Sequence, residues 1–182
     1  MIVVFEGLDG TGKSTLCRAF AAFLKAEYYP TPPKHFLARR NEIDAHASKE
    51  RHYRFFKAGV LVATREIRDL VHEGKQVAVD RYWMTTVAYH RAMGVDAQRK
   101  DFTDLCDPDA TIYTEARDEI RLQRIMTRGL TAGDQRTLSI QESTRVEYEK
   151  LLLAHRNVFR VDTSSINQRE GLQLVLKALQ LA

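Results

Sequence analysis

Apolar residues in this chain fall into short runs that alternate with longer periodic stretches. The short runs, rich in β-branched and aromatic residues, predict strands at residues 2–5, 28–30, 76–79, 110–113 and 158–161. Apolar residues that recur every three or four positions predict helices at 15–26, 49–73, 83–93, 97–106, 117–128, 139–155 and after residue 165. Such alternation is typical of a parallel sheet with helices on both faces. The pattern predicts one α/β domain over residues 1–182 with five parallel strands.

Local signals mark some of the element boundaries. Gly74 stands where the C-cap of the helix at 49–73 belongs, and Ser139 and Glu142 have the spacing of a capping box that would begin the next helix. The Thr-Pro-Pro sequence at 31–33 breaks regular structure. Residues 35–46 mix charged and apolar side chains, and a solvated helix and a loop both fit that pattern.

The most informative stretch follows the first predicted strand. Residues 7–14 read Gly-Leu-Asp-Gly-Thr-Gly-Lys-Ser, the G-x-x-x-x-G-K-S pattern of a P-loop, between a strand and a helix. Glycines let backbone N–H groups curl around a phosphate, and the helix N-terminus adds the positive end of its dipole. Lys13 can reach the β- and γ-phosphates of a nucleotide, and the Ser14 hydroxyl can coordinate Mg²⁺. The sequence therefore predicts a nucleotide-phosphate site.

A second candidate feature is the pair Asp80 and Arg81 at the end of the third predicted strand. A carboxylate in this place, downstream of a P-loop, is typical of a residue that holds Mg²⁺, usually through its waters. An arginine beside it can bind a phosphate through two hydrogen bonds. Carboxyl ends of parallel strands meet at one edge of a sheet, so we expect this pair to lie near the P-loop. For the nearby Tyr89 and His90, a substrate role and an ordinary structural role are both open.

The helix predicted at 117–128 leads into a basic segment. Its first arginines, Arg117 and Arg121, are interpreted as a solvated face. Residues 128–136 read Arg-Gly-Leu-Thr-Ala-Gly-Asp-Gln-Arg and predict a loop between two helices, part of a lid that extends to about residue 139. Such a lid can close over a polyphosphate, exclude water and bring arginines to the transferring group.

Composition narrows the function classes. The formal charge is +4 and the pI about 9.1, which suits anionic ligands, but no block of like charges marks a nucleic-acid tail. Nucleic-acid binding stays open, although no DNA- or RNA-reading motif supports it. Cys17 and Cys106 lack metal-ligand spacing and predict buried thiols in a reducing compartment. No apolar stretch approaches the ~18 residues of a membrane span, and the first residues lack the pattern of a signal peptide. We therefore expect a cytoplasmic protein with no membrane partner.

Together these features resemble the thymidylate kinases. The resemblance covers most of the chain in order, at residues 5–15, 73–82, 85, 88–89, 108–113, 124–129 and 161–164. It implies a three-layer P-loop NTPase fold, a five-stranded parallel sheet flanked by helices. It also implies ATP and Mg²⁺ as cofactors, a nucleotide or nucleoside as substrate, and a homodimer formed through helices.

The resemblance further implies roles for individual residues. Lys13 and Ser14 would hold the donor phosphates and magnesium, with Asp80 as the second metal residue. Asp9 would meet the acceptor sugar or a metal-bound water, and Arg81 the acceptor phosphate. The implied catalytic residues are Lys13, Asp9, Arg81, Asp80, Arg128 and Arg136. The donor nucleotide would be bound by Gly7, Asp9, Gly10, Thr11, Gly12, Lys13, Ser14, Thr15, Arg124 and Arg128. The acceptor would be bound by Asp9, Phe55, Arg81, Tyr82 and Tyr89, with Phe55 stacking on its base.

Departures from the family pattern leave the acceptor open. Some family members have a catalytic arginine where this chain has Gly10, so the lid must supply that charge. The family's acidic Arg-Glu-Pro-type segment is replaced by residues 31–34, Thr-Pro-Pro-Lys. A phosphate-gripping arginine of the family falls at Gly59, and Arg51, Arg54 or Arg65 are candidates to replace it.

Two kinase functions therefore compete. One is transfer of the ATP γ-phosphoryl group to a (deoxy)nucleoside monophosphate, which needs positioning and charge neutralisation but no base. The other is phosphorylation of a hydroxyl on a nucleoside, modified base or other small metabolite, with Asp9 or Asp80 accepting the proton. A GTPase would need Asn-Lys-x-Asp and D-x-x-G motifs, and neither is present.

Overall fold

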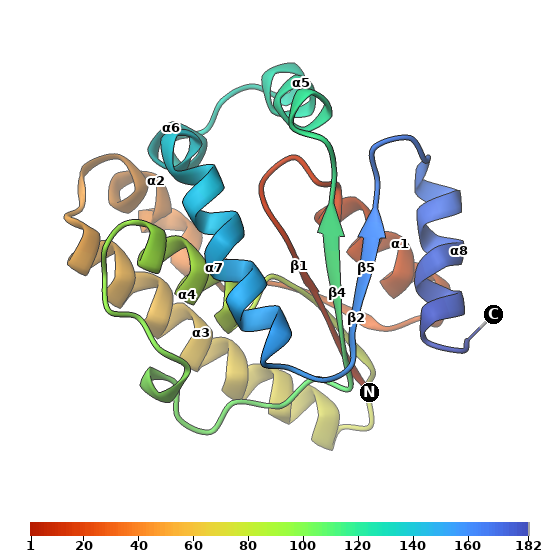
Figure 1. The fold of residues 1–182 in the computed structure, drawn as a ribbon. Coiled ribbons are helices and arrows are strands. Elements are labelled where there is room, and N and C mark those ends of the chain that lie inside the picture. The colour runs from red at the N-terminus through yellow and green to blue at the C-terminus, as the bar shows by residue number, and fades with distance from the viewer. Residues whose placement is uncertain (182) are drawn as a thin grey trace.

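Five strands form one parallel sheet in the computed structural model, which describes residues 1–181 (Figure 1). The strand order is β2-β3-β1-β4-β5. Their bounds are β1 Ile2–Glu6, β2 Glu27–Pro30, β3 Val77–Asp80, β4 Ala110–Glu115 and β5 Val158–Asp162. The five predicted strands and their parallel direction are thus confirmed. Phe5 at the end of β1 pairs in register with Asp80 at the end of β3, so the P-loop and Asp80 leave the sheet side by side.

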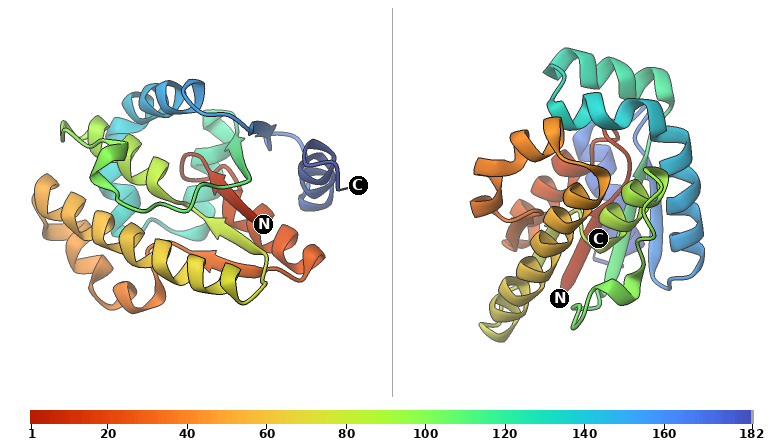
Figure 2. Two further views of the ribbon diagram at one scale, coloured as in Figure 1. Left: turned by 90° about the horizontal axis from the view of Figure 1, so that it is seen from below. Right: turned by 90° about the vertical axis from the view of Figure 1, so that its left-hand side faces the viewer.

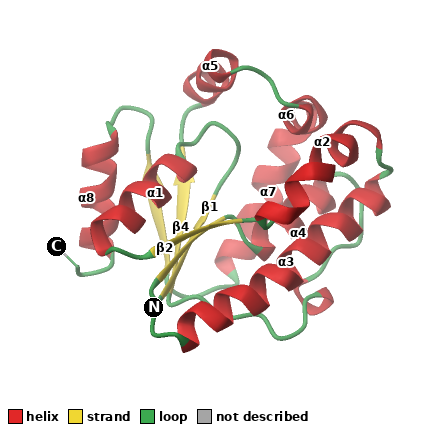
Figure 3. Ribbon diagram, turned by 180° about the vertical axis from the view of Figure 1, so that it is seen from behind, coloured by secondary structure: helices red, strands yellow, loops and turns green. Residues whose placement is uncertain are grey.

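Helices cover both faces of the sheet (Figures 1 and 3). On one face lie α1 (Lys13–Leu24) and α8 (Gln168–Ala178), and on the other α3 (Lys49–His72), α4 (Trp83–Ala92) and α7 (Gln141–Leu153). Alternation along β1 explains the two cores, because Val3 and Phe5 pack toward α1 and α8 while Ile2 and Val4 pack toward the other three helices. The central strand is buried along its whole length. The predicted three-layer architecture is therefore confirmed.

Three further helices stand near the carboxyl ends of the strands. They are α2 (Leu37–His46), α5 (Asp118–Arg128) and α6 (Ala132–Thr137). Figure 2 shows α5 and α6 beyond the end toward which the strands point. The segment at 35–46, left open by its composition, is thus a short 3₁₀ turn (Lys34–Phe36) followed by α2. Loops and helices at this edge have the freedom to form a site without disturbing the core.

Three local predictions are wrong. Residues 97–106 contain only a 3₁₀ turn, Arg99–Asp101, which begins at a capping box made by Gln98 and is followed by Asp104 with a φ of 55°. Ser139 does not cap α7, which begins at Gln141 after a second 3₁₀ turn, Leu138–Ile140. The predicted lid loop is instead largely helical, because Thr131 and Asp134 form a reciprocal capping box that begins α6.

Two further sequence expectations concern thiols and membranes. Cys17 is a buried free thiol, as predicted, and Cys106 is partly buried. Burial raises the pKa of the Cys17 thiol well above its usual range. None of the helices between residues 1 and 181 combines the length and the apolar character needed to cross a membrane.

Candidate active site

A cavity of about 950 Å³ opens at the carboxyl edge of the sheet. The P-loop and the ends of β3 and β5 line one part of it, and helices α2, α3, α4, α5, α6 and the start of α8 line the rest. Many of the predicted site residues meet there: Asp9, Gly10, Gly12, Lys13, Ser14, Thr15, Asp80, Arg81, Tyr89, Arg124 and Arg128. Others lie outside the lining: Gly7, Thr11, Phe55, Tyr82 and Arg136.

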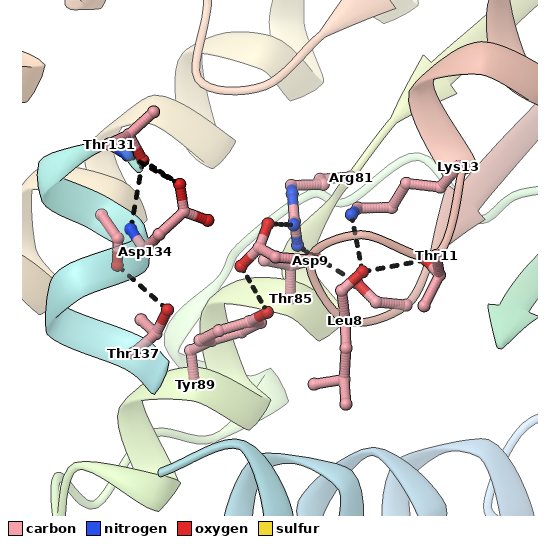
Figure 4. A network of polar contacts seen from close by, with 12 residues as sticks. Leu8, Asp9, Thr11, Lys13, Arg81, Thr85, Tyr89, Thr131, Asp134 and Thr137 are labelled. Carbon is pink, nitrogen blue, oxygen red and sulfur yellow. Dashed lines mark hydrogen bonds and ion pairs between the residues drawn. The ribbon is translucent and has the colours of Figure 1, made fainter. Parts of the chain in front are cut away.

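The P-loop owes its shape to backbone conformation and to two internal hydrogen bonds. Gly12 has a φ of 80° and caps α1. The Thr11 hydroxyl and the Lys13 ammonium both donate to the Leu8 carbonyl, at 2.9 and 3.0 Å (Figure 4). Burial, together with the nearby Arg81, lowers the pKa of Lys13 to about 8. The loop is thus preformed, and its buried ammonium group is positioned to bind an anion.

Asp9 and Arg81 form an ion pair between the P-loop and the end of β3 (Figure 4). The guanidinium of Arg81 also donates to the Gly7 carbonyl at 3.3 Å and to the Thr85 hydroxyl at 3.2 Å. The Tyr89 hydroxyl donates to the other oxygen of Asp9 at 2.9 Å. Burial opposes ionisation of Asp9, but Arg81 and Lys13 outweigh it and hold the pKa of Asp9 well below its usual range. Asp9 is therefore a carboxylate that is already paired.

The two carboxylate oxygens of Asp80 differ in their contacts. The Tyr28 hydroxyl donates to Oδ2 at 2.8 Å, while Oδ1 is buried with no hydrogen-bond partner among residues 1–181. The side chain is only 6% exposed, and both Asp80 and Ser14 line the cavity. An unpaired buried carboxylate oxygen is costly unless a cation or water meets it. Oxygen donors of this kind suit Mg²⁺.

Glu6 is a buried residue of the site that the motif search missed. Its carboxylate, 0% exposed, accepts hydrogen bonds from the backbone N–H groups of Tyr82 and Thr85 at 3.0 and 3.2 Å and from the hydroxyls of Thr85 and Tyr148. Burial raises its pKa, and these donors work in the opposite direction. Glu6 thereby caps the start of α4 and holds the Arg81 turn in place. The available signal was a glutamate at the end of a wholly apolar strand.

The interpretation of Arg121 as a solvated residue is wrong. Its side chain is 1% exposed, and its guanidinium donates to the Asp9 carbonyl at 2.9 Å and to Gln141 at 3.0 Å. The reason is that α5 packs directly on the P-loop, where a Cβ atom on Gly10 would lie 2.6 Å from the Arg121 carbonyl oxygen. Arg117, by contrast, is exposed as expected. This packing also explains why position 10 cannot hold an arginine.

The acceptor side differs from the predicted one. Phe55 packs edge-on against Phe36 and Phe56, and Phe56 is the ring that lines the cavity. Gly59 is buried, and a Cβ atom there would lie 2.9 Å from Cβ of Pro32. The Thr-Pro-Pro segment thus fills the space where a longer side chain would be, and Arg51, Arg54 and Arg65 lie outside the lining.

Arg40 on α2 is the cation that sequence reasoning overlooked on this side. Its guanidinium lies 5.8 Å from the centre of the Phe56 ring, and its Nε donates to Asp44 at 3.3 Å. The prediction for Tyr82 is wrong, because that side chain is 1% exposed in the core and its hydroxyl bonds to Thr64 at 2.7 Å. The signal for Arg40 was weak, since α2 had no clear periodicity.

The basic lid contributes one of its two terminal arginines to the cavity. Arg128 lines it and pairs with the buried Asp134 at 2.7 Å, the residue that also caps α6 (Figure 4 shows Asp134 with Thr131). Arg136 instead donates to the carbonyls of Asp44 and Ala47 at 2.9 and 2.7 Å. In this structure Arg136 therefore fastens α6 to α2 outside the cavity lining, and its catalytic role stays a prediction.

Arg124 approaches the P-loop from α5. Its guanidinium donates to the carbonyl oxygens of Gly10 and Thr163 at 3.3 and 2.7 Å and to the Thr163 hydroxyl at 2.9 Å. Arginines 124 and 128 therefore meet Lys13 at the same cavity. A site with these cations, an unpaired Asp80 oxygen and a P-loop can bind a magnesium polyphosphate.

The sequence model of the thymidylate kinase family matches residues 5–170. This chain belongs to the thymidylate kinase family. A thymidylate kinase of Leptospira borgpetersenii is 29% identical over 180 residues, 89% of this chain and 85% of that protein. One from Xylella fastidiosa strain Temecula1 is 32% identical over 147 residues, 72% of this chain and 68% of that protein.

The fold of this chain agrees with a solved structure of a thymidylate kinase. A thymidylate kinase from Candida albicans superposes with a TM-score of 0.78 over 99% of this chain and 92% of the other, at 17% identity. The P-loop NTPase fold predicted by resemblance is thereby confirmed. As a member of the thymidylate kinase family, the chain is an ATP-dependent nucleotide kinase, a phosphotransferase.

The burial of Arg121 generates a stability prediction. Arg121→Ala should lower the free energy of unfolding by about 2–4 kcal/mol, because it removes a buried guanidinium and leaves the Asp9 carbonyl and Gln141 without their donor. The matched control Arg117→Ala, an exposed arginine just before the same helix, should change it by less than about 0.5 kcal/mol. Urea unfolding followed by circular dichroism measures both. Equal, small changes would show that Arg121 is not part of a fixed contact.

The lowered pKa of Lys13 generates a pH prediction. Binding of a polyphosphate needs the protonated ammonium, which is lost as the pH rises through about 8. ATP affinity should therefore fall by about tenfold between ~pH 7 and ~pH 9, with proton uptake on binding. Calorimetry in buffers of different ionisation enthalpy measures both effects. Lys13→Arg keeps its charge over this range and should show no such fall; a parallel fall in that variant would contradict the assignment.

Proposed function

We propose that this chain transfers the γ-phosphoryl group of ATP to a thymidylate-type nucleoside monophosphate in the presence of Mg²⁺. One observation carries the proposal: the Asp9–Arg81 ion pair, the P-loop lysine and the Asp80 carboxylate share one cavity. A cavity of about 950 Å³ is large enough for a nucleotide-sized donor and part of an acceptor. The thymidylate-type acceptor is inferred from the relatives, which are named thymidylate kinases.

The donor side is assigned to the P-loop and the neighbouring arginines. Backbone N–H groups of residues 10–15 and the Lys13 ammonium bind the phosphates. Ser14 and the free oxygen of Asp80 would hold Mg²⁺, and the unpaired buried Oδ1 is the observation that fits a cation there. When bound, the metal would offset negative charge on the β- and γ-phosphates. Arg124 and Arg128 supply the positive charge that Gly10 cannot.

The state of Asp9 favours a phosphate acceptor over a hydroxyl. A hydroxyl acceptor needs a general base whose pKa lies near the working pH. Asp9 is held in its ionised form by Arg81 and Lys13, with its pKa well below the usual range, so it is a poor proton acceptor. A monophosphate is already an anion and a nucleophile, so positioning and charge neutralisation suffice. Arg81, which lines the cavity beside Asp9, is assigned to that phosphate.

On the acceptor side, Phe56 is assigned as the ring on which the base stacks, in place of Phe55. Arg40, which lies over the Phe56 ring and lines the cavity, supplies positive charge at the base end. The apolar face of α3, at Val60, Ala63 and Ile67, is buried within the chain's own core.

A panel of acceptors tests the proposed function. ADP release should occur with ATP, Mg²⁺ and a pyrimidine nucleoside monophosphate such as dTMP, and not with the unphosphorylated nucleosides. Lys13→Ala should remove most turnover while the protein stays folded, because it deletes the ammonium aimed at the donor phosphates. Turnover confined to unphosphorylated acceptors would reject the proposal in favour of a hydroxyl kinase.

Arg81 provides a test of the acceptor phosphate site. Arg81→Lys should lower kcat/KM for the monophosphate by about 100-fold, because an ammonium keeps the charge but cannot make the same paired hydrogen bonds. The KM for ATP should change much less. Steady-state kinetics with each substrate varied in turn separates the effects, with Arg65→Lys on the exposed surface of α3 as the control. A loss confined to ATP binding would move Arg81 to the donor side.

A further inference from the structure

Three buried polar side chains from three helices form one hydrogen-bonded chain beside Phe56. Asp44 on α2, His52 on α3 and His90 on α4 are 5%, 5% and 2% exposed, and all three line the cavity. His52 Nε2 lies 3.0 Å from Oδ1 of Asp44, and His52 Nδ1 lies 2.7 Å from Nε2 of His90. His90 Nδ1 lies 2.6 Å from the Thr86 carbonyl oxygen. Neither the motifs nor the proposed reaction uses these residues.

The order of donors and acceptors determines where the protons are. A carbonyl oxygen only accepts, so Nδ1 of His90 carries a hydrogen and donates to Thr86. Burial lowers the pKa of His90 to about 3, so the ring is neutral and its Nε2 is an acceptor. His52 must therefore donate from Nδ1 to His90. We assign these tautomers from the hydrogen-bond partners.

One more proton is then required between His52 and Asp44. With its hydrogen on Nδ1, a neutral His52 would point the lone pair of Nε2 at a carboxylate oxygen 3.0 Å away, and both are buried acceptors. Two facing acceptors without a proton are unfavourable in a buried site. The contact is made only when the pair holds a shared proton, as an imidazolium with a carboxylate or as an imidazole with a carboxylic acid.

The shared proton bears on the position of α2. Arg40 donates to Oδ2 of Asp44, and Arg136 from α6 donates to its carbonyl, so both charged neighbours act on Asp44. His52 itself packs on the Phe56 ring, with centres 4.6 Å apart. Within α2 only Ile43 is a buried apolar side chain, so this helix depends heavily on its polar contacts.

We propose that the Asp44–His52–His90 chain is a positioning element of the acceptor site, which holds α2 and α6 in place while the shared proton is present. Arg40, the cation assigned to the base end, stands on the same helix as Asp44. Loss of the proton would loosen α2 and with it the acceptor site, while the P-loop would be unaffected. The proposal rests on the proposed function, because it assigns this part of the cavity to the acceptor.

The test is direct binding of dTMP to the full-length protein without ATP, measured by calorimetry from ~pH 6 to ~pH 8, a range that extends to both sides of the ordinary pKa of a histidine. In the wild-type protein, affinity should fall by about tenfold across this range. Asp44→Asn should show nearly the same affinity at both ends. Its amide nitrogen can donate to Nε2 of neutral His52 and its oxygen can accept from Arg40, so no shared proton is needed.

Two further variants complete the design. Glu42→Gln, an exposed substitution on the same helix, should follow the wild-type pH dependence. Asp44→Leu removes every side-chain hydrogen bond at this position and should weaken dTMP binding at all pH values by about tenfold or more. A folded Asp44→Leu protein with unchanged binding would contradict the positioning role.

The remaining outcomes are distinguishable from failure of the proposed function. A flat pH profile in the wild-type protein, or an Asp44→Asn profile that still falls like the wild type, would overturn the inference alone. If dTMP and other nucleoside monophosphates neither bind nor are phosphorylated at any pH, the proposed function itself fails.

Discussion

The ion pair between Asp9 and Arg81 is the contact on which the arrangement of the cavity depends. It joins the loop after β1 to the turn after β3, the two neighbouring strand ends of the sheet. Arg81 has a φ of 68°, a conformation that side-chain-bearing residues adopt rarely, and the carboxylate of Glu6 holds the backbone that follows it. The strain at Arg81 is therefore compensated by hydrogen bonds that the backbone of residues 81 and 82 makes with the end of β1. Without the pair, Asp9 would be an unpaired, partly buried charge in a site that binds anions.

In the low-polarity environment of the cavity, the ionisation state of each charged group depends on the charged groups beside it. Lys13, Asp9 and Arg81 are three charged groups within one hydrogen-bonded region, and the net positive charge that remains is available to a polyphosphate. Burial weakens the hold of Lys13 on its proton, whereas the ion pair fixes Asp9 in the ionised state. Asp9 is therefore not suited to removing a proton from an acceptor. That is the electrostatic character expected of a phosphate-to-phosphate transfer.

The helices above the sheet are held to the P-loop and to each other by arginines. Arg121 ties α5 to the Asp9 carbonyl, and Arg136 ties α6 to α2 through two carbonyl groups. Guanidinium groups suit this work, because one side chain can satisfy several backbone oxygens at once. On the opposite side of the cavity, Pro32 fills the space beside Gly59. Arg40 on α2 lines the cavity there and lies near the Phe56 ring.

The amino-acid sequence by itself determined the strands, their direction, the P-loop and the position of Asp80 beside it. These features follow from local properties: apolar runs, helical periodicity, and glycines where the backbone needs positive φ angles. Because parallel strands end at one edge, two motifs far apart in the chain could be placed together without coordinates.

The tertiary structure decided which side of each helix faces the cavity and which polar groups are buried together. A rotation of one residue along α3 exchanges Phe55 for Phe56, and no periodicity in the sequence resolves so small a difference. The burial of Arg121 and the contact of His52 with His90 depend on how helices pack across long stretches of chain. A hydrogen bond between distant residues depends on where the fold places both groups. A single sequence shows which residues can donate and accept, but not which of them lie within hydrogen-bond distance.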